Sequence, residues 1–156
     1  MRRLITIAIV VSFVAPLVAV GSKKAEYVGG TIVGLPERTE GLLDTSGAEV
    51  FRFTPEKRGF AAIEVPYASI TSLEYGQKAG RRVGVAILVS PLALFSKKRK
   101  HFMTISFNDA EAKEQALVLE LGKDIIRTTL TVLETRSGKD IEYQDDEARK
   151  AGRGGN

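Results

Sequence analysis

Short stretches in which apolar and polar residues alternate recur along most of this chain. The clearest runs from residue 49 to residue 54, where Phe51 and Phe53 fall on one face and Val50 and Arg52 on the other. Alternation with a period of two is typical of a half-buried β-strand. On this basis the sequence predicts about seven short strands, at residues 27–33, 41–45, 49–54, 60–65, 69–75, 102–107 and 115–121.

Glycine and proline add detail to these predicted strands. Gly29 and Gly30, inside the first strand, predict a β-bulge or a close approach of two backbones. Pro66 ends the fourth strand, and Ile70 is expected to return to the core as the fifth strand starts. Within the fifth strand, alternation places Ile70, Ser72 and Glu74 on one face and Thr71, Leu73 and Tyr75 on the other.

From Asp124 the spacing of the apolar residues changes from two to between three and four. The apolar positions are Ile125, Ile126, Leu130 and Leu133. This spacing predicts an amphipathic helix. Asp124 is expected to cap its start and Gly138 to end it, with Arg136 and Lys139 near the negative end of the helix dipole.

The last residues differ from the predicted helix. Residues 141–143 are expected to form a brief extended piece. Residues 144–156 are charged, contain glycine and have almost no apolar side chains, so we expect a disordered tail.

The order of these elements predicts the fold class. Strands followed by one C-terminal helix indicate a mainly β protein, an antiparallel β-sandwich or partly open barrel capped by a helix. The helix would cover an open end that otherwise exposes core and strand edges. The length suits one domain, which we place at residues 26–143.

The first 21 residues are set apart by their pattern. Two arginines precede an apolar run at residues 4–14, and the segment Ala19-Val20-Gly21 supplies small residues at the spacing a signal peptidase reads. We therefore expect residues 1–21 to be a signal peptide, cut after Gly21 or at a neighbouring bond, and the protein to be exported to the periplasm or cell envelope. An uncleaved anchor and a buried helix are the alternatives.

The amino-acid composition excludes several kinds of functional site. The chain has no cysteine, so it can form no disulfide, thiolate metal site or cysteine nucleophile. His101 is the only histidine. Without further ligands it does not predict a zinc site, and no serine lies in a nucleophile-elbow pattern. We expect His101 to be an ordinary half-buried strand residue, and we expect no enzyme activity and no metal or other cofactor.

A second apolar run, the insert at residues 83–95, lies between two basic clusters. About 13 apolar-rich residues make a helix of roughly 20 Å, shorter than a hydrocarbon core of about 30 Å, and Pro91 interrupts the run. The insert could dip into an anionic membrane surface or contact an envelope protein; it could equally be a buried strand or helix. For the first interpretation the contact residues are Arg81, Arg82, Leu88, Leu92, Leu94, Phe95, Lys97, Lys98, Arg99 and Lys100.

Three short motifs resemble the pleckstrin-homology-like (PH-like) superfold, in particular GRAM and bacterial PH-like domains. They are GLLDT at residues 41–45, VFRF at residues 50–53 and VPYASI at residues 65–70. The resemblance covers residues 27–138 and implies a β shell closed by a C-terminal helix. It does not imply phosphoinositide binding, because the loop residues that would cradle an inositol phosphate have no counterpart here.

These observations predict an exported, non-enzymatic PH-like interaction module. Its basic-flanked insert would contact an anionic membrane surface or an envelope protein by charge attraction and shallow apolar insertion. The alternative is a binding protein for a small apolar ligand held between sheet and helix. Nucleic acid is not an expected partner, because the net charge is only +4 and the basic clusters lack interleaved aromatic residues.

Overall fold

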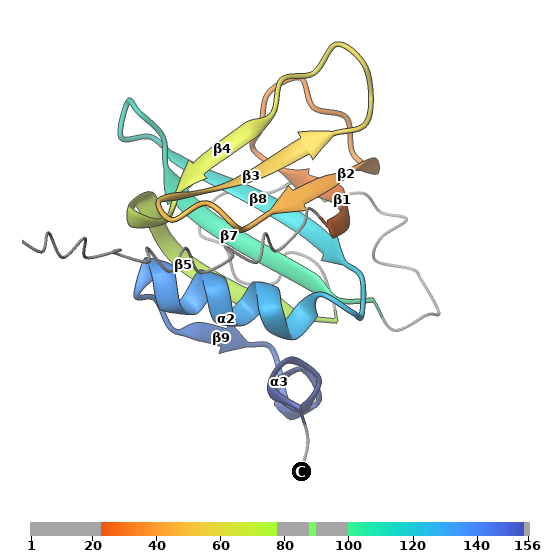
Figure 1. Cartoon of the computed structure of the whole chain (residues 1–156), viewed down its shortest axis with the longest axis vertical. Coiled ribbons are helices and arrows are strands. Elements are labelled where there is room, and N and C mark those ends of the chain that lie inside the picture. Colours follow the sequence, from red (N-terminus) through yellow and green to blue (C-terminus); the bar gives the residue numbers. More distant parts are fainter. Residues whose placement is uncertain (1–22, 78–87, 90–99, 155–156) are drawn as a thin grey trace, which may run out of the picture.

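The computed structural model describes residues 23–77, 88–89 and 100–154 (Figure 1). Its strands are β1 (Lys23–Gly30), β2 (Thr39–Asp44), β3 (Val50–Pro55), β4 (Ile63–Pro66), β5 (Ile70–Gly76), β6 (Leu88–Val89), β7 (Phe102–Asn108), β8 (Glu114–Leu121) and β9 (Ile141–Tyr143). Its helices are the short 3-10 helix η1 (Tyr67–Ser69), α2 (Ile126–Ser137) and α3 (Asp146–Arg153). Of the described residues, 45% lie in strands and 21% in helices, which confirms the mainly β class.

All the strands belong to one curled sheet with the order β4-β3-β2-β1-β8-β7-β5-β9, and β6 pairs with β1 outside this path. Strands β1 to β4 form one antiparallel series and β5, β7 and β8 a second, and the β1–β8 pair joins them. The result is an open half-barrel with α2 lying beside β5 and with α3 beyond it (Figure 1). The seven predicted strands are all present, with shifted ends, and the predicted extended piece is β9, parallel to β5.

The interior of the half-barrel is filled by the apolar faces of the strands. In β3 the predicted alternation is confirmed, because Phe51 and Phe53 are 0% exposed while Arg52 is exposed. Helix α2 adds Ile126, Leu130 and Leu133 to the same core cluster. Burying side chains of this size is worth about 1.5–3 kcal/mol each, so the contact with α2 holds the helix on the sheet.

Gly30 confirms the predicted close approach of two backbones. The register of the β1–β8 pair shifts between Tyr27 and Gly29, as a bulge requires. Gly30 has a φ of 144°, and a β-carbon there would overlap the carbonyl oxygen of Ala116. Only glycine fits this position without strain.

The predicted faces of β5 are wrong at its first residues. Ile70 lies in the same core cluster as Leu73 and Tyr75, while Thr71 is exposed. The register of the β5–β7 pair shifts between Ile70 and Ser72. This irregularity reverses the alternation, which is why a strict period of two assigned Ile70 to the opposite face.

The corner between β4 and β5 follows the sequence prediction. Pro66 ends β4, η1 makes the turn, and Ile70 enters the core. The ring of Tyr67 is buried at this corner, where the guanidinium of Arg136 lies 5.4 Å from its centroid. The same Arg136 Nη1 donates to the carbonyl oxygens of Thr45 and Gly47, so the last turn of α2 is tied to the β2–β3 turn.

The ends of α2 agree with the prediction only in part. Gly138 ends the helix in the left-handed region, with a φ of 67°. The start differs, because the N-cap is Ile125 and no side chain, Asp124 included, accepts a hydrogen bond there. The expected Asp124 cap is therefore wrong.

The prediction of a disordered tail is also wrong, because residues 146–153 form α3. Asp145 caps this helix by accepting a hydrogen bond from the Ala148 backbone at 2.7 Å. Ala148 and Gly152, four residues apart, are the buried positions of α3. A β-carbon on Gly152 would lie 2.8 Å from the ring of Tyr143 and 2.9 Å from Leu130. These two small residues let α3 pack closely, and a search for large apolar side chains overlooks them.

Candidate functional site

The sequence-predicted contact residues lie mostly outside the described parts of the chain. Lys100 is described with its side chain, and Leu88 by its backbone as part of β6. The other predicted residues fall outside the described ranges, namely Arg81, Arg82, Leu92, Leu94, Phe95, Lys97, Lys98 and Arg99. The described part of the site therefore consists of the residues at the base of the insert, around the end of β5 and the start of β7.

The two ends of the connection that carries the insert lie side by side. Gly76 and Phe102 are paired at the end of the antiparallel β5–β7 ladder. Gln77 and His101 come directly after and directly before this pair. Both basic clusters of the sequence are therefore tethered to one point at the end of two neighbouring strands.

The middle of the insert is bound to the sheet. Leu88 is paired with Gly30 and Val89 with Gly29. They lie on the same edge of β1 as β2, beyond the end of the β1–β2 ladder, because β8 occupies the other edge at Gly29 and Gly30. These two residues are in strand conformation, so the helical interpretation of the insert does not hold for them.

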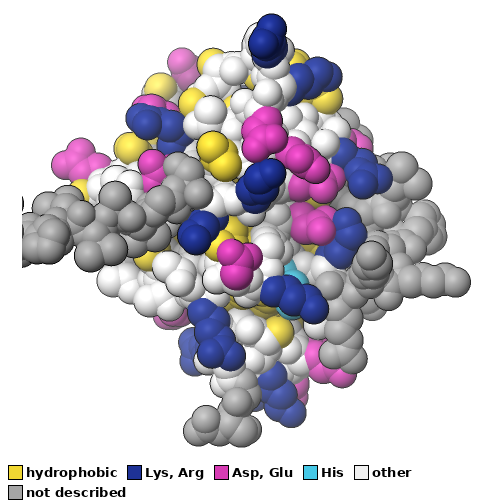
Figure 2. All heavy atoms as spheres, turned by 45° about the vertical axis from the view of Figure 1, so that its right-hand side comes forward, with side chains coloured by type: hydrophobic (Ala, Val, Ile, Leu, Met, Phe, Trp, Pro, Cys, Tyr) yellow, Lys and Arg dark blue, Asp and Glu magenta, His cyan; other side chains and the backbone are white. Residues whose placement is uncertain are grey.

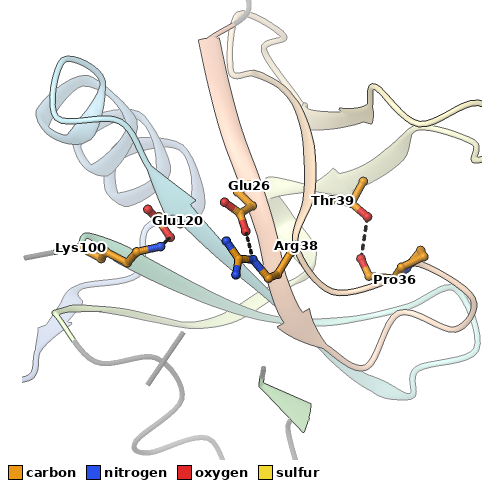
Figure 3. Close-up of polar contacts among 6 residues, drawn as sticks. All are labelled: Glu26, Pro36, Arg38, Thr39, Lys100 and Glu120. Atoms are coloured by element: carbon orange, nitrogen blue, oxygen red, sulfur yellow. Dashed lines mark hydrogen bonds and ion pairs between the residues drawn. The ribbon is translucent and has the colours of Figure 1, made fainter. Parts of the chain in front are cut away.

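Lys100 is held in an ion pair. Its Nζ lies 2.5 Å from Oε2 of Glu120, and the side chains are 21% and 23% exposed (Figure 3). On the same sheet face, the Arg38 Nε lies 3.3 Å from Oε1 of Glu26 (Figure 3). Glu26 is the direct cross-strand neighbour of Glu120. Like charges placed opposite each other destabilise a sheet, and these two cations offset that repulsion.

The row of carboxylates extends further across the sheet. Glu40 lies opposite Glu26 on the other side of β1. Glu26, Glu40, Glu56 and Glu120 all line a hollow of about 250 Å³ on this face, together with Lys24. Three cations, Lys24, Arg38 and Lys100, accompany these four carboxylates, so the described charges of the face formed by β2, β1 and β8 sum to one negative charge. This face therefore does not attract an anionic surface.

His101 and Tyr75 form a buried polar pair near the base of the insert. The Tyr75 hydroxyl lies 2.6 Å from Nδ1 of His101. His101 is 8% exposed and Tyr75 is fully buried, so Tyr75 packs in the core and His101 is more buried than expected. Burial, and then the positive charge of Lys123, lowers the pKa of His101 below its usual 6.5. Burial raises the pKa of Tyr75 to about 12. Both side chains are thus neutral at neutral pH.

His101 also forms part of the wall of a second hollow, of about 510 Å³. Its lining is Gln77, His101, Lys123, Asp124, Ile126, Arg127 and Ala151. These residues come from the ends of β5 and β7, the turn after β8, the start of α2, and α3. Figure 2 shows this face, with the histidine (cyan) recessed between basic side chains (dark blue). We call it the His101 hollow.

Sequence reasoning missed the His101 hollow. Lys123 and Arg127 are unremarkable as a turn residue and a first-turn helix residue, and neither stands near His101 in the sequence. Only the pairing of β7 with β8 brings them together. The one available signal was the break between the strand period and the helix period at residue 124, which marks a point where a turn and a helix start meet.

Comparison with known proteins gives no family. The chain matches no protein-family model, and it matches no curated protein. Within the described ranges, neither α-helix has the length and apolar character needed to cross a bilayer. In the same part of the chain, no three histidine or acidic side chains gather as a metal site would require.

Proposed function

We propose that this chain is a PH-like interaction module that contacts an anionic membrane surface through the insert at residues 83–95. The observation that carries the proposal is the Gly76–Phe102 pair, which tethers both ends of the insert connection to one place. In the sequence, the basic residues 81–82 follow β5 and the basic residues 97–99 precede β7. The export of the protein, which residues 1–21 predict, belongs to the same proposal.

The PH-like assignment is supported by the order of the elements. The resemblance implies a β shell closed by a C-terminal helix. The chain has two antiparallel series of strands joined into one half-barrel, followed by α2. The VPYASI motif forms the corner between the two series, where Tyr67 and Arg136 connect sheet and helix. Strands β6 and β9 and helix α3 are additions to this plan.

The charges set the size of the expected effect. Lys100 is paired with Glu120 and is not counted. The basic residues that the proposal assigns to the membrane surface are then Arg81, Arg82, Lys97, Lys98 and Arg99. At about 1 kcal/mol each near an anionic surface, they contribute about 5 kcal/mol. That alone corresponds to a dissociation constant of about 0.2 mM. Micromolar binding needs about 3 kcal/mol more, which one or two large apolar side chains of the insert supply on leaving water.

The acidic face restricts the orientation of the module. Glu26, Glu40, Glu56 and Glu120 share one side of the β2–β1–β8 surface. This side is expected to point away from an anionic leaflet, because its charges sum to a small negative value once Lys24, Arg38 and Lys100 are counted. The base of the insert, with Lys123 and Arg127 nearby, carries the opposite sign and supports an approach by that end.

Sedimentation with vesicles tests the proposal. Phosphatidylglycerol vesicles and zwitterionic phosphatidylcholine vesicles are compared for the full chain and for the triple variant Lys97→Ser, Lys98→Ser, Arg99→Ser. Lys100 is left intact, because its removal would strip Glu120 of its partner. Any contribution of the N-terminal apolar segment is common to all variants and is measured on the zwitterionic vesicles.

The matched control removes the same charge elsewhere, with Lys139→Ser, Arg149→Ser and Lys150→Ser. These three side chains are exposed after α2 and on α3. We expect the 97–99 variant to lose at least about tenfold in affinity for anionic vesicles, and the control to lose little. Equal binding by both variants overturns the proposal, and a protein partner in the envelope would then be the function to pursue.

The alternative of a small apolar ligand gains no support from the described residues. Core side chains that are at most 9% exposed occupy most of the interior between sheet and α2. A hollow between β2 and the start of α2 has a volume of only about 160 Å³, below the size of a typical small-molecule site. The His101 hollow and the hollow beside Glu26 are both lined by charged groups. An apolar ligand would have to displace core side chains or leave charges unsatisfied.

A further inference from the structure

The His101 hollow has the size and the charge of a small-ligand site. Its volume of about 510 Å³ falls within the range of sites that hold small molecules. Among the described residues, the charged members of its lining are two cations, Lys123 and Arg127, and one carboxylate, Asp124. The described lining is therefore net positive by one charge while His101 is neutral.

We propose that the His101 hollow binds a phosphate group, carried either by a lipid headgroup or by a soluble phosphate ester. The guanidinium of Arg127 matches two oxygens of a phosphate, and the ammonium of Lys123 acts as a point charge. The volume leaves room for the organic group to which the phosphate is attached.

Asp124 is the one carboxylate among the described residues that line the hollow. Its Oδ1 lies 2.8 Å from the place that a β-carbon on Gly122 would take, so this oxygen is close to the turn that precedes α2. Lys123 and Arg127 outnumber this carboxylate, so the described lining still favours an anion.

His101 can contribute a hydrogen bond. When the Tyr75 hydroxyl donates to Nδ1, the neutral imidazole carries its proton on Nε2, which can then donate to a phosphate oxygen. The charged groups that act on His101 are Lys123 and Glu120, and Glu120 is already paired with Lys100. A bound phosphate adds negative charge and favours the protonated imidazolium. His101 is therefore both a ligand and a reporter of binding.

The position of the hollow connects it to the proposed function. Gln77 and His101, which flank the base of the insert, both line it. A phosphate bound there would lie where the insert leaves the sheet. The lipid source rests on the proposed membrane function, whereas binding of a soluble phosphate does not.

The lone histidine makes the test direct, because the imidazole signals in an NMR spectrum belong to His101 alone. The full chain is titrated with inorganic phosphate and with glycerol 3-phosphate, and with sodium chloride at matched ionic strength. We expect a saturable shift of the His101 signals with either phosphate, a rise in its apparent pKa, and no saturable shift with chloride.

Two double variants locate the binding. Lys123→Ser with Arg127→Ser is expected to weaken phosphate binding at least about tenfold. Lys139→Ser with Arg149→Ser removes the same charge from exposed sites and is expected to bind as the parent does. No saturable phosphate shift, the same shift with chloride, or equal weakening in both variants overturns the proposal.

Phosphatidylglycerol vesicles distinguish the two sources of phosphate. Saturating glycerol 3-phosphate is added to the vesicles, with sodium chloride at matched ionic strength as the control. If it weakens vesicle binding of the parent but not of the Lys123/Arg127 variant, the ligand is a headgroup; if it leaves vesicle binding of the parent unchanged, the ligand is a soluble ester. The two proposals also fail separately. The membrane function fails when the 97–99 variant binds vesicles like its control, and the phosphate site fails in the NMR titration.

Discussion

The hydroxyl of Tyr75 and Nδ1 of His101 lie 2.6 Å apart, and both side chains are buried. The two residues belong to neighbouring parts of the sheet, β5 and the approach to β7. Their hydrogen bond satisfies two polar groups that the fold removes from water. It also fixes the imidazole at the wall of the His101 hollow, next to the base of the insert.

Replacing Tyr75 by Phe removes the hydroxyl and leaves Nδ1 of His101 buried without this partner. We expect the free energy of unfolding to fall by about 1–3 kcal/mol, the usual cost of an unsatisfied buried polar group. Urea unfolding at neutral pH measures the change. The matched control is Tyr143→Phe, at a half-buried ring, where we expect less than about 1 kcal/mol. Equal losses would show that the His101 contact is not important for stability.

Stability should fall as the pH drops below the usual histidine range. The pKa of His101 in the folded protein lies below 6.5, so between the two values the unfolded chain binds a proton that the folded chain does not. Stability is therefore fully present above about pH 6.5 and is lost as the pH falls, until the folded histidine also protonates. Urea unfolding at about pH 7.5 and about pH 5.5 measures the difference.

The variant His101→Gln serves as the control for this pH effect. Asp44 and Asp109 have pKa values lowered below 3.8 by their hydrogen bonds, so their contributions change only in more acidic solution. The parent should lose stability over the histidine range and the variant should not. A flat profile for the parent would contradict the burial of a neutral His101.

The strands were predictable because their information is local. In β3, Phe51 and Phe53 alternate with exposed residues, and the corner at Pro66 has its own turn chemistry. The corner motif predicted that Ile70 is buried, but alternation wrongly placed it on the face opposite Leu73, because a register shift against β7 lies between Ile70 and Ser72. Alternation describes one strand at a time and contains no information about its partner.

The His101 hollow and α3 required tertiary information. Lys123, Arg127 and Ala151 come together with His101 only after β7 has paired with β8 and α3 has packed near β5. In α3 the buried positions are Ala148 and Gly152, which carry almost no side chain. A prediction that relies on large apolar residues therefore treats such a segment as exposed to solvent.

Gly152→Val tests how closely α3 packs. A β-carbon there would lie 2.8 Å from Tyr143, 2.9 Å from Leu130 and 3.2 Å from Tyr75. We expect overpacking to cost about 1–3 kcal/mol and to release α3 from the body. Hydrogen exchange of the amides at residues 146–153 should then speed up, while exchange in α2 changes little.

The control for α3 is Lys150→Val, which places the same β-branched side chain on the exposed side of the helix. It should cost only the lower helix propensity of valine, up to about 0.7 kcal/mol. If both variants exchange at the same rate, the close contact of Gly152 with Tyr143 does not hold α3 in place.

Gly30→Ala should be among the most damaging single substitutions in the sheet. Gly30 has a φ of 144°, and the new methyl group would overlap the carbonyl oxygen of Ala116 in β8. Backbone strain costs about 1–3 kcal/mol, and the overlap with β8 adds to it, because main-chain atoms cannot move aside as a flexible side chain can.

Gly59→Ala separates the two effects, because Gly59 has a φ of 90° and nothing within 4 Å of a β-carbon. We expect thermal unfolding to show a clearly larger loss for Gly30→Ala. Since Gly30 also pairs with Leu88 of the insert, the same variant should weaken binding to phosphatidylglycerol vesicles if the contact with β1 positions the insert. Similar losses in thermal stability for both variants would contradict the close approach of β1 and β8.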